Sequence, residues 1–442
     1  MPGHLLEWKD GQFTEKSYHP AGSTNPAPHD IHEAAEELDD LLTKSVKEQL
    51  VSDVPVGLWL SGGLDSSTIL HYASKISPDP VRTFSITFKG RTFDESEPIS
   101  QIQRHYGSIH EEFNLGEDAD LEGAIRKMSF FSDEPSADAG ALPAWFLAEM
   151  TARKVTVVLS GEGSDELFAG YLTYKADRYA AMARKVPSAV RRAALSAANL
   201  LPVSDDKISF EYKLKRFLQG TLLSPEQAHI FWNGTFSEAE KREFFRYADS
   251  TALDGILRGM GQERGLNRFL NFDLRYYLAD DILYKVDRMS MAHSLEARPP
   301  FLDPRIVDFA ARLPEKFKLN GSKSKFVLRE LMKDKLPKEI MRRPKIGFDI
   351  PVHDWLRTAL CPLLLDTISE DAVRSSGLFH WTGVEKILAD HLERRANLGY
   401  HLWGLMILLL WMKEWKIAPP LPAEEMDNSE VPALVLHQVG SL

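Results

Sequence analysis

A segment rich in glycine and serine, Ser61–Ser67, carries the strongest chemical signal in the chain. It reads Ser-Gly-Gly-Leu-Asp-Ser-Ser between an expected buried strand at 56–60 and an expected helix from Ser66 to Lys75. Two glycines allow a tight turn that exposes backbone N–H groups, the hydroxyls add donors, and the helix N-terminus adds positive potential. The segment lacks the lysine of the GxxxxGK[ST] loop. We therefore predict an anion cradle of a different kind, rather than a Gly-Gly turn without function.

A second segment of this type, Ser160–Glu166, reads Ser-Gly-Glu-Gly-Ser-Asp-Glu and follows another expected buried strand at 155–159. Ligands of open α/β sheets bind at the carboxyl edge of the strands, so both segments should meet there. Asp65 and Asp165 offer the hard oxygen ligands that Mg²⁺ needs beside phosphates, which leaves Glu162 to orient a substrate. A solvated acidic turn explains poorly why two glycine-rich segments follow two buried strands.

The elements around these segments alternate between strands and helices. Further strands are expected at 81–88 and 110–114, and a further helix at 95–106. Such alternation predicts an α/β fold, a parallel sheet with helices on both faces. The β signal largely disappears beyond Gly170, where helices are expected at 176–186, 268–285 and 325–335. We expect an α/β part over about 30–175 and a mostly helical part over about 176–417.

The two ends of the chain have a different character. Asp10-Gly11 between two strand-like runs predicts a hairpin within residues 1–19, followed by a linker at 20–29. Asp30, with Glu33 three residues later, is typical of a helix start. Residues 418–442 show no periodicity, so we expect a flexible tail.

Composition limits the class of protein. A balance of 53 basic and 64 acidic residues gives a net charge of -11, which argues against a nucleic-acid partner. The apolar run at 402–411 is too short to span a bilayer, so no membrane partner is expected. The single cysteine, Cys361, excludes an internal disulfide framework and fits a cytoplasmic protein.

A third motif, Asp287–Asp303, reads DRMSMAHSLEARPPFLD. Together with the two loops it resembles the synthetase domain of the glutamine-hydrolysing asparagine synthetases, members of the ATP pyrophosphatase superfamily. The resemblance extends through Lys325–Arg329 and Arg342–Phe348, and it covers about 31–415. It implies an adenine nucleotide alpha hydrolase-like fold. Apart from this resemblance, the simplest interpretation of His293, with Glu296 and Arg298, is a structural hydrogen-bonded network on a helix end.

The resemblance also implies roles for individual residues. Asp65 and Asp165 match the family's magnesium ligands, and the catalytic candidates are Glu162, Lys325 and Asp165. Glu162 matches a glutamate linked to the adenylate, and Lys325 matches a lysine near the phosphates. Without the motif match, Lys325 would be an ordinary solvated lysine on a helix surface. The resemblance implies two groups of ATP-binding residues. The residues at the β,γ-phosphates are Ser61, Gly62, Gly63, Asp65, Ser66 and Ser67. The residues around the adenosine are Leu60, Ile86, Ser160 and Gly161.

The implied activity is an ATP-dependent amide-forming ligase. It would adenylylate the side chain of aspartate and transfer ammonia, giving asparagine, AMP and pyrophosphate. Family members begin with an amidotransferase domain whose cysteine follows Met1, but Pro2 stands there in this chain. Residues 1–19 resemble a remnant hairpin of that domain. The sequence is thus a fragment or truncated product, or it uses free ammonia, or a separate glutaminase chain supplies it. A homodimer is compatible with all three.

The segment Asp133–Pro143 leaves the substrate open. In well-studied asparagine synthetases it carries threonines and an arginine suited to aspartate, but here it is acidic and small. Aspartate is therefore held differently, or another small carboxylate is the substrate. The alternatives are a related amidotransferase or cyclase, or an ATP-binding partner subunit.

Overall fold

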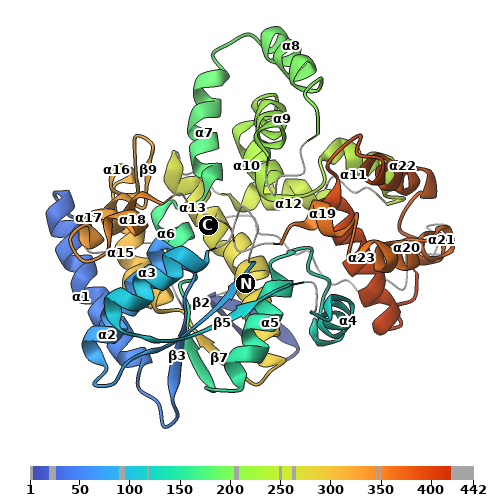
Figure 1. Cartoon of the computed structure of the whole chain (residues 1–442). Helices are drawn as coiled ribbons and strands as arrows, with labels where there is room; N and C mark the ends of the chain where they lie inside the picture. Colours follow the sequence, from blue (N-terminus) through green and yellow to red (C-terminus); the bar gives the residue numbers. More distant parts are fainter. Residues whose placement is uncertain are drawn as a thin grey trace.

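The computed structural model describes residues 3–18, 26–88, 95–116, 119–203, 209–247, 251–260, 265–343, 347 and 350–419. Its centre is a five-stranded sheet in the order β5-β4-β3-β6-β7, with every neighbouring pair parallel (Figure 1). The strands are β3 (Val56–Trp59), β4 (Arg82–Thr87), β5 (Ile109–Asn114), β6 (Val157–Leu159) and β7 (Glu296–Arg298).

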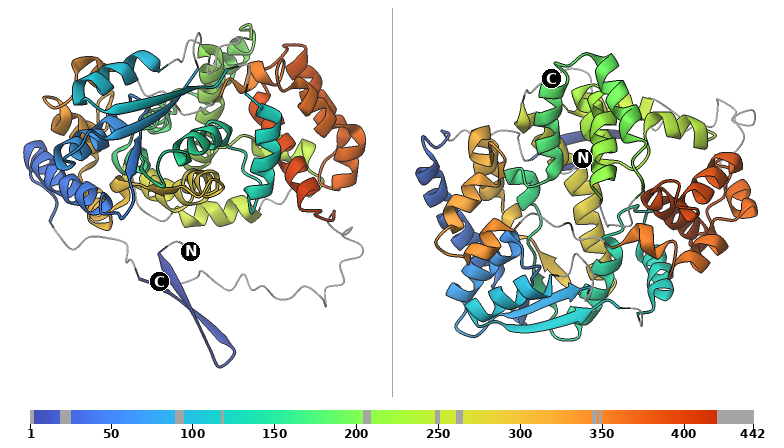
Figure 2. Two further views of the ribbon diagram at one scale, coloured as in Figure 1. Left: turned by 60° about the horizontal axis from the view of Figure 1, so that its bottom comes forward. Right: turned by 45° about the horizontal axis from the view of Figure 1, so that its top comes forward.

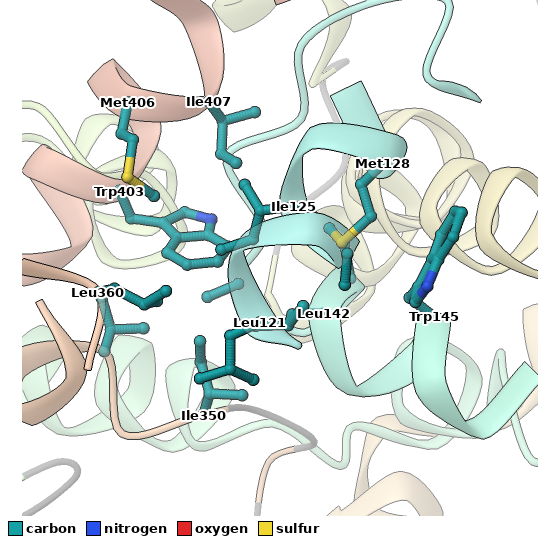
Figure 3. Close-up of a cluster of buried hydrophobic side chains, with 14 of the residues drawn as sticks. Leu121, Ile125, Met128, Leu142, Trp145, Ile350, Leu360, Trp403, Met406 and Ile407 are labelled. Atoms are coloured by element: carbon teal, nitrogen blue, oxygen red, sulfur yellow. The ribbon is translucent and has the colours of Figure 1, made fainter. Parts of the chain in front are cut away.

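The sheet separates two hydrophobic cores, because successive side chains of a strand point to opposite faces. Leu58 belongs to the core formed with α1, α2 and α3, whereas Trp59 belongs to the core formed with α4, α5 and α23 (Figure 3 shows part of the latter). These helices are α1 (Ile31–Gln49), α2 (Leu64–Ile76), α3 (Ser96–Tyr106), α4 (Leu121–Phe131), α5 (Ala141–Ala152) and α23 (Gly399–Glu414). The predicted α/β fold with helices on both faces is confirmed.

Local sequence signals account for several element boundaries. The Asp30 side chain accepts hydrogen bonds from the N–H groups of His32 and Glu33, so it caps α1 as predicted. The hairpin of β1 (His4–Lys9) and β2 (Gln12–Ser17) turns at Asp10 and Gly11, which both have positive φ. Every residue of these two strands is exposed, and Figure 2 shows the hairpin apart from the sheet and its helices. Residues 420–442 of the expected tail at 418–442 and residues 20–25 of the expected linker at 20–29 lie outside the described residues.

Most of the chain beyond Gly170 is helical. The elements between β6 and β7 are α6 (Ser164–Phe168), α7 (Leu172–Ala183), α8 (Ser188–Ala198), α9 (Phe210–Thr221), α10 (Pro225–Asn233), α11 (Glu238–Phe244), α12 (Thr251–Gly259), α13 (Leu266–Arg275), the π-helix η1 (Leu278–Leu283) and α14 (Tyr284–Met291). After β7 come η2 (Pro300–Leu302), α15 (Pro304–Arg312), α16 (Glu315–Lys318), the pair β8 (Leu319–Asn320) and β9 (Lys323–Ser324), α17 (Phe326–Met332), α18 (Lys338–Arg342), α19 (Val352–Trp355), α20 (Cys361–Thr367), α21 (Glu370–Ser376) and α22 (Trp381–Leu392).

One strand was not predicted. Residues 296–298 were expected at the end of a helix, but they form β7, which pairs with β6 at the edge of the sheet. The Arg298 side chain reaches across to the backbone oxygens of Gln49 and Val51, where it caps the end of α1. The three residues are polar and few, so no hydrophobic pattern marks them as a strand.

The apolar run at 402–411 is explained by burial rather than by a membrane. It lies in α23, and Leu402, Trp403 and Met406 are fully buried in the core shown in Figure 3. No helix within the described ranges is long and apolar enough to cross a bilayer.

A buried ionic network holds three of the later helices together. His229 of α10 lies 2.7 Å from an Asp177 oxygen of α7 and 2.9 Å from an Asp273 oxygen of α13. Tyr174 donates to the other Asp273 oxygen at 2.6 Å. Burial alone would lower the pKa of His229, but the charge of Asp273 and the hydrogen bond to Asp177 raise it to about 10. Burial also raises the pKa of Asp177.

Replacing His229 with glutamine should therefore lower the free energy of unfolding by about 3 kcal/mol at pH 6, because a buried carboxylate loses its cation. The pKa of His229 is higher in the folded protein than in the unfolded chain. The stabilisation from its charge is therefore complete below about pH 6.5 and disappears as the pH approaches 10. Thermal unfolding of both proteins at pH 6 and pH 9.5 measures this, with exposed His32→Gln as the control. A loss that does not shrink at pH 9.5 would contradict a charged His229.

Candidate functional site

The first predicted loop lies between β3 and α2. Gly62 has φ +64°, and an added Cβ would come within 2.9 Å of the Ile99 backbone nitrogen, so glycine is required there. The Ser66 hydroxyl accepts from the Ser61 N–H at 3.2 Å and holds the turn closed. Helix α2 begins at Leu64, two residues earlier than predicted, which places Asp65, Ser66 and Ser67 in its first turn.

The second predicted loop lies between β6 and α6, and it packs directly against the first. An added Cβ at Gly161 would lie 3.2 Å from Asp65 Cβ and 3.2 Å from the Ser66 nitrogen. Ser164 donates its hydroxyl to Asp65 Oδ1 at 2.9 Å. Parallel pairing of β3 with β6 brings the two loops to the same carboxyl edge, as predicted.

Lys325 joins the two loops electrostatically. Its Nζ lies 2.6 Å from Asp65 Oδ2 and 2.6 Å from Asp165 Oδ1, and its side chain is only 5% exposed. The residue has φ +52° and donates its N–H to Phe168 O at 3.0 Å. Lys325 is thus a buried cation fixed by the backbone, not the solvated lysine that was the sequence-based alternative.

Gly170 provides the space for this ion pair. An added Cβ at this position would overlap both Asp165 Oδ1 and Lys325 Cε. The Gly170 N–H also donates to the Asp165 backbone oxygen at 2.8 Å, which closes α6. The sequence motifs did not single out Gly170, because its role depends on a lysine 155 residues later in the chain.

The donor set at this junction fits Mg²⁺ bound together with phosphates. Asp65 and Asp165 supply two carboxylates for one ammonium, and Mg²⁺ is commonly held by one or two carboxylates plus substrate oxygens. No group of three or more potential metal ligands occurs in the described part of the chain, so the remaining ligands would come from substrate and water. Ser67 and Ser160 are buried, yet their hydroxyls have no hydrogen-bond partner among the described residues. Such orphaned donors suit a bound polar ligand.

The four positions expected around an adenosine lie at one edge but on different sides of the sheet. Leu60 and Ser160 follow the adjacent strands β3 and β6, and Ile86 lies near the end of β4. Leu60 packs in the core with α1 and α2, whereas Ile86 packs in the core with α4 and α5. Gly161 continues from Ser160 beside the first loop.

A second charged cluster lies next to the loops and was not predicted as such. Lys285 of α14 is 2.5 Å from Asp138, and its side chain is only 8% exposed. Burial would lower the pKa of Lys285, but the charges of Asp138, Glu162 and Asp281 outweigh burial and raise it. Burial and the nearby Asp138 raise the pKa of Asp281, which lies in the π-helix η1, to about 7. The charge of Glu162 therefore acts on Lys285, whereas Asp165 pairs with Lys325.

Two further polar side chains belong to the sequence motifs. Glu166 is buried and accepts from Tyr171 at 2.7 Å; burial and the adjacent Asp165 raise its pKa to about 8. It therefore belongs with the wall of the site rather than with the charged ligands. His293 packs its ring against Trp145 and hydrogen-bonds to Met289 O at 3.0 Å, whereas Glu296 and Arg298 of the predicted network pair with each other.

Residues 37–415 match the family model described as asparagine synthase. The chain belongs to the asparagine synthase family. The predicted membership of an enzyme family of the asparagine synthetase type, a ligase, is thereby confirmed. The site geometry and the family match agree on the same stretch, because both loops and Lys325 lie within it.

Curated relatives cover most of this chain. Asparagine synthetase [glutamine-hydrolyzing] 1 of Bacillus subtilis is 28% identical over 407 residues, 91% of this chain and 62% of the relative. Asparagine synthetase [glutamine-hydrolyzing] 3 of the same organism is 27% identical over 341 residues, 72% and 50% respectively. Amidase chyE of Penicillium rubens is 24% identical over 443 residues, 90% and 65% respectively. The chain thus spans between half and two thirds of the length of these relatives.

Proposed function

We propose that this chain adenylylates a carboxylate with ATP and transfers ammonia to it, with the side chain of aspartate as the carboxylate. The observation that carries the proposal is Lys325, buried between Asp65 and Asp165 where two glycine-rich loops meet. The loops offer N–H groups and hydroxyls to the β,γ-phosphates, including the unpaired hydroxyl of Ser67. Mg²⁺ held by Asp65 and Asp165 would neutralise charge on the phosphates.

The proposed reaction has two steps. A carboxylate oxygen attacks the α-phosphorus, the bond to the oxygen bridging the β-phosphate breaks, and pyrophosphate leaves. Ammonia then attacks the acyl carbon, the bond to AMP breaks, and the nitrogen releases one proton. The fixed Lys325 ammonium stabilises the negative charge that accumulates on the phosphates in the first step. Binding both reactants at one edge supplies their orientation.

The Lys285 cluster is our candidate for the acceptor side of the site. It combines one cation, Lys285, with the carboxyl groups of Asp138, Asp281 and Glu162. A zwitterionic amino acid offers an ammonium and carboxylates, so both signs of charge have partners there. Asp138 lies in the segment Asp133–Pro143, which in well-studied asparagine synthetases carries an arginine suited to aspartate. Its contact with Lys285 supports an arrangement in which Lys285 binds aspartate in place of that arginine.

Lys285→Met should raise KM for aspartate about 10- to 100-fold and leave KM for ATP unchanged, because one charge-assisted contact is lost. Steady-state kinetics measure this, with exposed Lys333→Met as a control and Lys285→Met/Asp138→Asn to remove the buried charge left behind. An unchanged KM for aspartate in both folded variants would contradict this placement of the acceptor.

The test of the proposed function is pyrophosphate release by the purified chain with ATP, Mg²⁺ and ammonium, with and without aspartate, followed by mass detection of asparagine. We expect aspartate-dependent pyrophosphate and asparagine. Pyrophosphate that appears only with another carboxylate would favour a related amidotransferase or cyclase. The similarity of this chain to amidase chyE is the reason to test that alternative. Nucleotide binding without pyrophosphate from any carboxylate would favour an ATP-binding partner subunit.

A further inference from the structure

Arg343 joins a late segment of the chain to the first glycine-rich loop. It follows α18, and its side chain is 13% exposed. Its Nη1 donates to the backbone oxygens of Ser61 at 3.3 Å and Gly62 at 3.2 Å. Its Nη2 donates to Glu95 at 2.8 Å. The guanidinium thus contacts three acceptors, two of which belong to consecutive peptide groups of the loop.

Glu95 connects the same arginine to the support of the loop. It immediately precedes α3, whose first turn contacts Gly62 through Pro98 and Ile99. Both side chains of the Glu95–Arg343 pair are largely buried, with 16% and 13% exposed. The pair therefore fixes the guanidinium on the side of the loop where α3 packs.

The contacts determine where the loop N–H groups point. A trans peptide places its C=O and N–H on opposite sides. Because Arg343 holds the oxygens of Ser61 and Gly62, the N–H groups of Gly62 and Gly63 point away from it. Among the residues that the structure describes, the Gly63 N–H makes only a long contact, 3.4 Å, with the Ser61 hydroxyl. A cation at the oxygen end also polarises each peptide and strengthens its N–H as a donor.

We propose that Arg343, held by Glu95, is a positioning residue that orients the Gly62 and Gly63 N–H groups toward the β,γ-phosphates. This inference rests on the proposed function, since it assigns those phosphates to the loop. Arg343 acts through the loop, because its hydrogen bonds hold two backbone oxygens of the loop and the Glu95 carboxylate. Its effect should therefore depend on the guanidinium's shape as well as on its charge.

The test compares binding of α,β-methylene-ATP with Mg²⁺ and binding of AMP, each by calorimetry, in Arg343→Gln, Arg343→Lys, Glu95→Gln and Arg342→Gln. Arg343→Gln should weaken the triphosphate analogue about 10- to 100-fold and leave AMP affinity within about twofold. Arg343→Lys should restore little of this loss, and Glu95→Gln should weaken the analogue in the same selective way. Arg342→Gln, the neighbouring arginine, removes the same charge and should bind like the wild type.

Several outcomes would overturn the positioning role. One is complete restoration by Arg343→Lys, which would mean that charge alone matters. Another is an equal loss for AMP and the analogue, or an equal loss in Arg342→Gln. If Arg343→Gln does not fold, wild-type binding in Glu95→Gln would be decisive against the inference. A wild type that binds the analogue but releases no pyrophosphate would refute the proposed function only, because the readout here is binding.

Discussion

Replacing Gly170 with alanine should reduce pyrophosphate release at least about 100-fold, because the new methyl group must displace Asp165 and Lys325 from each other. The glycine has no positive φ to explain it, so the close approach of these two side chains is its reason. Fixed catalytic charges lose most of their effect when they move by about 1 Å. Initial rates of pyrophosphate release measure the change.

The control for Gly170→Ala is Gly116→Ala, whose added Cβ would meet its nearest neighbour, Asn114, at an ordinary 3.5 Å. It should keep the wild-type rate. Both variants should retain a melting temperature close to that of the wild type if the clash is relieved locally. A fully active Gly170→Ala protein would show that the Asp165–Lys325 arrangement is not needed for turnover.

Lys325→Met should lower kcat about 100- to 1,000-fold, because the reaction loses the one described cation that contacts both site carboxylates. Methionine has similar length and must adopt the same positive φ, so backbone strain is not a difference between the two proteins. Lys325→Arg keeps the charge but brings a planar guanidinium into a space shaped for a compact ammonium, and we expect it to recover only part of the rate.

The matched control for Lys325→Met is Lys323→Met, an exposed lysine two residues earlier in the chain. It removes the same charge from the same segment and should leave kcat unchanged. Equal rates for Lys325→Met and the wild type would remove Lys325 from the proposed first step. Equal losses in both lysine variants would point to the segment's fold instead of to the buried charge.

The glycine-rich loops could be predicted from sequence because the signal is local. Each one follows a short buried strand, and parallel pairing then requires Ser61 and Ser160 to meet at one edge. The same reasoning predicted the magnesium candidates Asp65 and Asp165. The cap of α1 at Asp30 and the hairpin turn at Asp10 and Gly11 are local for the same reason.

The missed features depend on contacts between distant segments. Lys285 and Asp281 have i, i+4 spacing on what was expected to be one helix, a pattern usually found on a solvated face. The packing of α14 against α5 brings Lys285 to Asp138, where the charges of Glu162 and Asp281 also act on it. The sequence signal that could have identified Asp281 and Lys285 was their i, i+4 spacing immediately before the Asp287–Asp303 motif. Strand β7 was missed because its three residues are paired by tertiary packing rather than by an apolar pattern.

In the proposed reaction, a carboxylate attacks the α-phosphorus of ATP at the junction of the two loops. Its most direct test is turnover of aspartate labelled with ¹⁸O in the side-chain carboxylate, with ATP, Mg²⁺ and ammonium, followed by mass analysis of AMP. We expect AMP that carries one ¹⁸O atom from the carboxylate, with one molecule of asparagine formed for each molecule of AMP. Unlabelled AMP, or formation of ADP and phosphate in place of AMP and pyrophosphate, would contradict it.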